Sequence, residues 1–364
     1  MTFTYSEDCL FLNIWAPKEA KDCPVLIYIH GGSFTGGSAD EGHISGAAYA
    51  KNGIIFAAMN YRLGPFGFCS HPDLTDKNGV CGNFGLYDQF TAIKWIKDNI
   101  SAFGGNPDKI TLIGQSAGAM SVDIQLSNPM SLGWFSGAIL MSGAALQRAA
   151  LKPATPESSK PFWDEVIKCA KCKDIEELRK TDEKTLFYAW LEAQKNIKGS
   201  MRFTLPVYDG RLLSKGNFKL KTLPNIPYII GVTSHDMLPA GLELLARRWA
   251  KRAMKNGNKN CYVYNFVHNL PGDNGGAWHS SDLLYAFATL HKNWRPFEPV
   301  DFDLANQMIA SFCAFVKTGN PNCRRIPYWE SRPDMALRFC EDTKMMKWPT
   351  KMLINNTIHN NGPM

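Results

Sequence analysis

Short apolar runs recur along the 364 residues of this chain and are separated by amphipathic stretches, a pattern that predicts strands and helices in alternation. Continuous apolar runs are typical of strands that are covered on both faces, as in a parallel sheet. The predicted strands are residues 24–29, 54–60, 110–113, 137–143, 227–232 and 261–267, preceded by an alternating strand at 10–15. Apolar residues at helical spacing predict helices at 85–100, 240–254 and 304–317. We therefore expect an α/β fold with a mostly parallel central sheet flanked by helices.

A charged, helical segment interrupts this pattern after Leu151. No linker-like run separates it from the rest of the chain. We therefore interpret residues 1–364 as a single domain, in which segments at about 151–205 and 238–256 form a helical cap. The second segment contains a basic amphipathic helix. Such a helix can lie on an anionic membrane, but a solvated cap helix is the commoner case and is the interpretation we adopt.

The candidate nucleophile is Ser116, in the sequence Gly114-Gln-Ser-Ala-Gly118. A predicted strand precedes this motif and a predicted helix begins near Ala117, which is the strand–turn–helix context of a nucleophile elbow. Crowding explains the two glycines, because side chains at 114 and 118 would collide with the neighbouring strand and helix. The strained turn would hold the Ser116 hydroxyl clear of the sheet, at the start of a helix that favours negative charge.

A second glycine-rich segment, His30-Gly31-Gly32-Ser33, follows the strand predicted at 24–29. A phosphate-binding loop is one reading, but the lysine of a P-loop and the G-x-G-x-x-G spacing are both missing from the sequence. The other reading is an oxyanion loop, whose backbone N–H groups hold the charged oxygen of an acyl-transfer intermediate. We adopt the second interpretation, with His30 supporting the loop.

A serine nucleophile also needs a base and a carboxylate that orients the base. In this kind of fold the chain order is serine, acid and histidine, each on a loop after a strand. Asp236 follows the strand predicted at 227–232 and is the natural acid, although capping of the next helix would also explain it. His268 and His279 both lie beyond the last of these strands, so chain order alone leaves either one open as the base.

Two long motifs lie at residues 7–17 and 103–118. They resemble the two signatures of the type B carboxylesterases, the cholinesterase-like branch of the α/β-hydrolases. The resemblance implies an α/β-hydrolase fold. It also favours His279 as the base, because residues 275–285 look like the family's histidine motif.

The same resemblance implies the remaining roles at the site. The backbone amides of Gly32, Ser33 and Ala117 are expected to form the oxyanion hole. Asp236 stands where the family usually has a glutamate, which is one methylene longer. No metal or organic cofactor is implied.

Two departures from the family pattern affect the expected function. The chain begins almost at the first signature, so we expect a fold shortened at its N-terminal side, and only 43 residues separate Asp236 from His279. The aromatic wall that binds choline in cholinesterases comes largely from the segment before that signature, which argues against cholinesterase activity. We predict a serine carboxylic-ester hydrolase with a Ser-His-Asp triad, acting on small to medium esters. The alternative is a non-catalytic binding protein, or a truncated inactive remnant, on the same fold.

Composition changes this picture little. The formal net charge of +7 is mild for the length and does not suggest a nucleic-acid partner, and no apolar run reaches the roughly 20 residues needed to cross a bilayer. The ten cysteines are scattered, and no signal peptide precedes the first motif, so we expect a cytoplasmic protein without stable membrane insertion. We also expect an exposed sheet edge at residues 10–15 to favour homo-oligomers.

Overall fold

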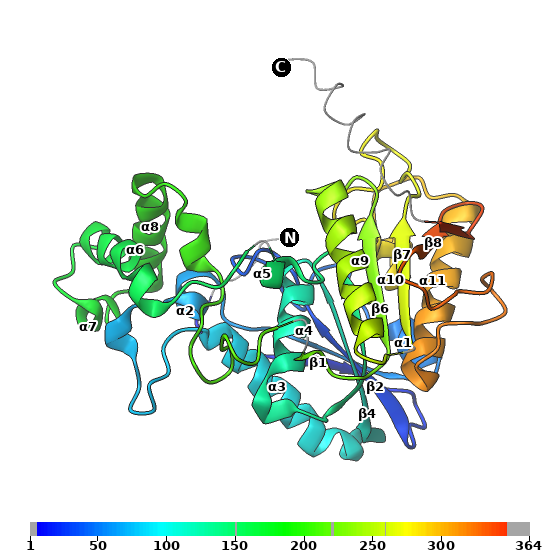
Figure 1. Cartoon of the computed structure of the whole chain (residues 1–364), viewed down its shortest axis with the longest axis horizontal. Helices are drawn as coiled ribbons and strands as arrows, with labels where there is room; N and C mark the ends of the chain where they lie inside the picture. The colour runs from blue at the N-terminus through cyan, green and yellow to red at the C-terminus, as the bar shows by residue number, and fades with distance from the viewer. Residues whose placement is uncertain (1–5, 150, 220–221, 259, 348–364) are drawn as a thin grey trace.

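The computed structural model describes residues 6–149, 151–219, 222–258 and 260–347. Within these residues one sheet of nine strands runs through the molecule in the order β1-β3-β2-β4-β5-β6-β7-β8-β9 (Figure 1). β1 pairs antiparallel with β3, and β9 pairs antiparallel with β8, whereas the other pairings are parallel. The strands are β1 (Leu12–Trp15), β2 (Cys23–Ile29), β3 (Ile55–Met59), β4 (Gly105–Gln115), β5 (Phe135–Met141), β6 (Tyr228–Thr233), β7 (Cys261–Phe266), β8 (Met335–Phe339) and β9 (Lys344–Lys347).

Helices cover both faces of this sheet (Figure 1). The apolar core on one face combines Ile27 of β2 with residues of α3, α4 and α9, and the core on the other face combines Tyr28 with residues of α1, α10 and α11. Successive side chains of a strand point to opposite faces, so β2 contributes to both cores. These helices are α1 (Ala47–Lys51), α3 (Phe84–Asn99), α4 (Ala117–Ser127), α9 (Pro239–Lys255), α10 (Leu283–Ala286) and α11 (Pro299–Thr318). The expected α/β architecture is confirmed.

The parallel strands bring distant segments of the chain to one edge of the sheet. Gly114 pairs with Ile29 and Gln115 with Met141. Met141 also pairs with Gly231, and Thr233 pairs with Phe266, so the ends of five neighbouring strands lie in one row. The glycine-rich loop follows β2, the serine motif follows β4, and the acid follows β6. Ligand sites of open parallel sheets form at this carboxyl edge.

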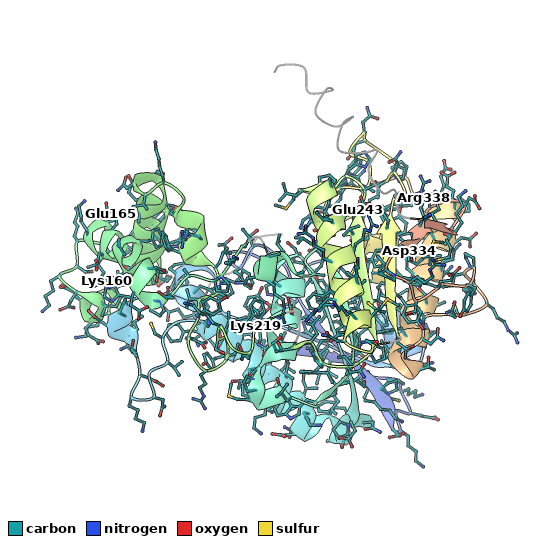
Figure 2. The ribbon with its side chains drawn as sticks, viewed as in Figure 1. Lys160, Glu165, Lys219, Glu243, Asp334 and Arg338 are labelled. Carbon is teal, nitrogen blue, oxygen red and sulfur yellow. The ribbon has the colours of Figure 1, made fainter. Side chains whose placement is uncertain are left out.

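Residues 151–205 form a lobe beside the sheet, which Figure 1 shows at the left. Its helices α6 (Pro156–Cys169), α7 (Ile175–Leu178) and α8 (Glu183–Asn196) enclose an apolar core of their own, which includes Phe162, Trp163 and Trp190. Charged side chains such as Lys160 and Glu165 cover its outside (Figure 2). We refer to these three helices as the helical lobe.

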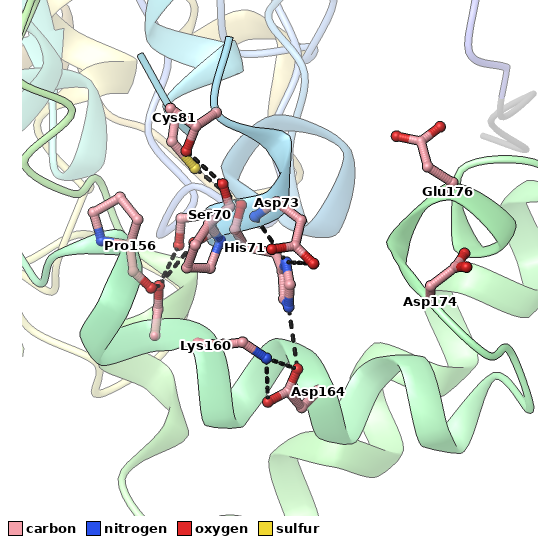
Figure 3. Close-up of polar contacts among 12 residues, drawn as sticks. Ser70, His71, Asp73, Cys81, Pro156, Lys160, Asp164, Asp174 and Glu176 are labelled. Carbon is pink, nitrogen blue, oxygen red and sulfur yellow. Dashed lines mark hydrogen bonds and ion pairs between the residues drawn. The ribbon is translucent and has the colours of Figure 1, made fainter. Parts of the chain in front are cut away.

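The helical lobe is joined to the sheet domain by polar contacts to the segment after α2 (Gly64–Phe68). Figure 3 shows the buried His71, whose Nε2 lies 3.1 Å from Oδ1 of Asp164 on α6. The hydroxyl oxygens of Ser70 and Ser159 are 2.8 Å apart, and Trp163 Nε1 donates to Ser70 Oγ at 3.2 Å. These contacts fix the lobe through side chains that lie far apart in the sequence.

This architecture differs from the sequence analysis at two places. Segment 238–256 does not join the lobe. It forms α9, which packs on β6 and β7 and buries Trp249 in the sheet core, because α9 connects these two neighbouring parallel strands and such a crossover helix packs back onto the sheet. Strands β8 and β9 are not predicted by the sequence analysis, yet they extend the sheet beyond β7.

Candidate active site

Ser116 occupies a strained turn between β4 and α4. Its backbone dihedrals are φ 56° and ψ −122°, a conformation that costs a non-glycine residue on the order of 1–3 kcal/mol. A Cβ at Gly114 would lie 2.3 Å from the carbonyl oxygen of Gly118, and a Cβ at Gly118 would lie 2.0 Å from that of Ile29. Both glycines are therefore sterically required. The Ser116 N–H donates to the Met141 carbonyl at 2.8 Å and fixes the turn on β5.

His279 and Asp236 form a hydrogen-bonded pair at the same edge of the sheet. His279 Nδ1 lies 2.5 Å from Asp236 Oδ1. The Asp236 side chain is fully buried, and that of His279 is 19% exposed. Burial alone would raise the pKa of Asp236, but the hydrogen bond and charge of His279 oppose it, so the pKa lies below its usual value. The carboxylate is therefore ionised at neutral pH and favours the Nδ1–H tautomer of His279.

A backbone link brings these two residues together. His235, next to the acid, donates its N–H to the Ala277 carbonyl at 3.0 Å, and His235 and Trp278 form an isolated parallel bridge. The helix-cap explanation of Asp236 is not supported, because α9 begins at Pro239 and its N-cap residue, Leu238, has no side-chain cap bond.

Gln115 also reaches this pair and was missed by the sequence analysis. Its Nε2 lies 3.2 Å from His279 Nε2, so the amide donates to the imidazole nitrogen that faces away from Asp236. Among the described residues, Ser116 Oγ makes no hydrogen bond with His279. The place of Gln115 at the end of β4, next to the nucleophile, is the sequence signal that could have identified it.

The glycine-rich loop lies against the nucleophile. A Cβ at Gly31 would be 3.1 Å from Ser116 Cβ, and Gly32 has φ 101°. Ser33 also adopts a left-handed conformation, with φ 57°. Within the described residues, the N–H groups of Gly32, Ser33 and Ala117 donate no hydrogen bond, so they are available to an anionic ligand. For Ala117 this follows from its place in the first turn of α4.

The two other candidate histidines have structural partners. His30 Nδ1 donates to the Gly31 carbonyl at 2.9 Å and its ring stacks on Tyr61 at 4.4 Å between centroids. Burial lowers the pKa of His30 to about 4, so it stays neutral. His268 Nε2 lies 2.8 Å from Oδ1 of Asp301, at the start of α11. His268 is therefore held away from the Asp236 carboxylate.

A second buried carboxylate, Asp282, lies behind the pair and was not singled out from the sequence. Tyr264 donates to its Oδ2 at 2.7 Å, while its Oδ1 has no partner among the described residues. Burial raises the pKa of Asp282 to about 6, with a smaller contribution from the negative charge of Asp236. No group of three or more metal-ligating side chains is found in the described part of the chain.

A profile of the carboxylesterase family matches residues 1–247 and 242–354. The chain belongs to the carboxylesterase family. This family member is 38% identical over 239 residues to a fumonisin B1 esterase of Sphingopyxis macrogoltabida, and 34% identical over 246 residues to a para-nitrobenzyl esterase of Bacillus subtilis. These matches cover 62% and 64% of the chain but 42% and 47% of the relatives, so the chain spans less than half of their length.

Solved structures of carboxylesterases share the fold. The carboxylesterase EST55 of Geobacillus stearothermophilus superimposes with a TM-score of 0.80 at 29% identity, over 94% of this chain and 84% of that one. The type B carboxylesterase resemblance and the α/β-hydrolase fold are both confirmed. The relatives of this chain are named as esterases, lipases and cholinesterases.

Proposed function

We propose that this chain is a serine carboxylic-ester hydrolase in which Ser116 is the nucleophile, His279 the base and Asp236 the residue that orients the base. The observation that carries the proposal is the hydrogen-bonded His279–Asp236 pair beside the strained serine turn. An ionised, buried acid on Nδ1 leaves Nε2 as the proton acceptor, which is what a serine nucleophile requires.

The reaction proceeds by two acyl transfers. Ser116 Oγ attacks the ester carbonyl carbon while its proton passes to His279 Nε2. The N–H groups of Gly32, Ser33 and Ala117 hold the resulting oxyanion. Collapse expels the alcohol, which takes the proton from His279, and leaves an acyl group on Ser116. Water then attacks the acyl-enzyme by the same route in reverse, giving the acid and free Ser116.

Gln115 adds a step before the chemistry. Its amide occupies His279 Nε2 in the structure, so the imidazole must exchange this donor for the Ser116 hydroxyl before it can accept a proton. A bound ester that displaces the Gln115 amide would allow this exchange. Small to medium carboxylic esters are the proposed substrates.

A fluorophosphonate probe tests this function directly. We expect the probe to label the wild-type chain covalently and to leave Ser116→Ala unlabelled, with kcat on a short-chain p-nitrophenyl ester lowered by ~10⁴-fold or more. The control is Ser136→Ala on β5, which removes a serine hydroxyl that bonds to the Ile110 carbonyl and has no role in the candidate site. An unlabelled wild-type chain would favour the alternative of a non-catalytic binding protein. Labelling that persists in a folded Ser116→Ala variant would place the nucleophile elsewhere.

A further inference from the structure

Helix α9 has an inner and an outer face of different character. Leu245 and Trp249 on the inner face are buried against the sheet. The outer face has exposed side chains at positions three and four apart, and residues with this spacing lie on one side of a helix. We call this row the α9 strip; it consists of Leu244, Arg248, Lys251 and Lys255.

The end of the strip nearest the candidate acid is apolar. Met237, Leu238 and Leu244 are 68%, 62% and 45% exposed. Single exposed apolar residues are ordinary, but here three large ones gather at the start of one helix, two directly before α9 and one in its second turn. We call Met237, Leu238 and Leu244 the apolar tip; Leu244 belongs to both the tip and the α9 strip.

The remainder of the strip is cationic. None of Arg248, Lys251 and Lys255 forms a salt bridge within the part of the chain that the structure describes. The nearest acid in the sequence is Glu243, labelled on α9 in Figure 2. Burial raises its pKa to about 7, so its carboxyl is only partly ionised at neutral pH and offsets little of the positive charge.

We propose that the α9 strip and the apolar tip dock on an anionic lipid surface. Apolar side chains beside cations are the pattern of interfacial binding, in which the former enter the headgroup region and the latter attract anionic lipids. A nucleic acid would use the cations but leave the apolar tip in water. A second copy would present the same cations to itself and be repelled. No helix among the described residues is long and apolar enough to span a bilayer, and docking requires none.

Docking places the catalytic edge of the sheet at the lipid. Met237 directly follows Asp236, so part of the apolar tip lies on the loop that carries the candidate acid. Esters dissolved in the lipid would then enter the site without passing through water. This consequence rests on the proposed esterase function, whereas the binding itself does not.

Vesicle sedimentation tests the proposal. The full chain is mixed with vesicles of phosphatidylcholine alone or with about 30% phosphatidylserine. We expect at least ~10-fold tighter binding to the anionic vesicles, weakening as salt is raised. Arg248→Gln combined with Lys251→Gln should weaken binding by about 30-fold. Met237→Ser combined with Leu244→Ser should weaken it by about 10-fold. The matched control, Lys173→Gln with Lys180→Gln, removes two exposed cations from the helical lobe and should bind like wild type.

The results distinguish an anionic lipid surface from a second copy of the chain as the partner of the α9 strip. Equal binding to both vesicle types, or undiminished binding of the Arg248/Lys251 variant, overturns the proposal. A concentration-dependent dimer in sizing chromatography that the same substitutions abolish would assign the strip to a second copy. Hydrolysis of a water-soluble ester is measured in parallel, and we expect it to be unchanged in the Arg248/Lys251 variant. Vesicle binding by a chain that the fluorophosphonate probe does not label would leave docking in place without ester hydrolysis.

Discussion

The catalytic edge of the sheet and the helical lobe are stabilised by different kinds of interaction. At the catalytic edge, Ser33, Ser116, Ser142 and Ser280 all have positive φ, so the backbone is held in conformations that these residues rarely adopt alone. Helix α4 begins at Ala117, and its N-cap residue Ser116 makes no side-chain cap bond. Its stability comes from packing on β4 and β5, where all of its residues are buried.

Each helix of the lobe instead begins with a side-chain cap. Thr155 forms a capping box at α6, Asp174 caps α7 and Asp182 caps α8. Among the described residues from 151 to 198, Lys171 is the only non-glycine residue with a positive φ. The lobe therefore follows local rules, while the catalytic edge departs from them and depends on long-range packing to impose strain.

Replacing each of the two candidate bases by alanine tests which histidine belongs to the catalytic edge. His279→Ala should lower kcat/KM on a p-nitrophenyl ester by ~10⁴-fold or more and abolish probe labelling, because the base would be lost. His268→Ala should keep most of the labelling and lower thermal stability, because it removes one of the partners of the buried Asp301 carboxylate. The reverse result would make His268 the base.

Unfolding of the lobe tests how separate the two regions are. Trp163 is fully buried in the lobe core, so Trp163→Ala should destabilise the lobe by about 3–5 kcal/mol. We expect faster hydrogen exchange in α6 and α8 with probe labelling of Ser116 preserved. Tyr188→Ala is the control, since Tyr188 is 67% exposed on the same lobe. Loss of labelling in the Trp163 variant alone would mean that the lobe completes the site.

The raised pKa of Asp282, near the catalytic edge, predicts that the free energy of unfolding depends on pH. Its folded pKa of about 6 exceeds the usual 3.8, so between these pH values the folded state binds a proton that the unfolded state has lost. Stability should therefore fall as pH rises from about 4 to 6. Asp282→Asn, which still accepts from Tyr264, should flatten this slope and be more stable at pH 7 by about 3 kcal/mol. Melting curves across pH measure it, and identical slopes would show that Asp282 is not the titrating group.

The smallest effect concerns a single cap. The Asp182 carboxylate accepts from the N–H groups of Lys184 and Thr185, so Asp182→Ala should destabilise the lobe by about 1 kcal/mol. Glu183→Ala serves as the control, because it removes a neighbouring acid that caps no N–H group among the described residues. Proteolysis within α8 should accelerate for the first variant only; equal rates would mean that the cap contributes nothing.

Much of the fold could be predicted because its signals are local. The strand at 24–29 and the helix at 85–100 correspond to β2 and α3 within a residue or two, since long apolar runs and helical spacing report burial directly. The short strands β8 and β9 could not be predicted. Over only five and four positions their burial follows neither a regular alternation nor a continuous buried run, so the pairing of β8 with β7 and of β9 with β8 decides their conformation.

The position of α9 illustrates the same limit. Its sequence determined a basic amphipathic helix, but not whether the apolar stripe faces a cap or a sheet. Both surfaces bury apolar side chains equally well, so the stripe alone carries no information about its partner.

The sequence by itself determined which residues could form a site: a serine between two obligatory glycines, a glycine-rich loop, and an acid and a histidine after later strands. Only the tertiary structure decided which histidine meets Asp236, because His279 approaches through the backbone link from His235 to Ala277. It alone placed the Gln115 amide on the same imidazole. Hydrogen bonds between residues 43 and 164 positions apart depend on strand order and register, which local sequence patterns do not encode.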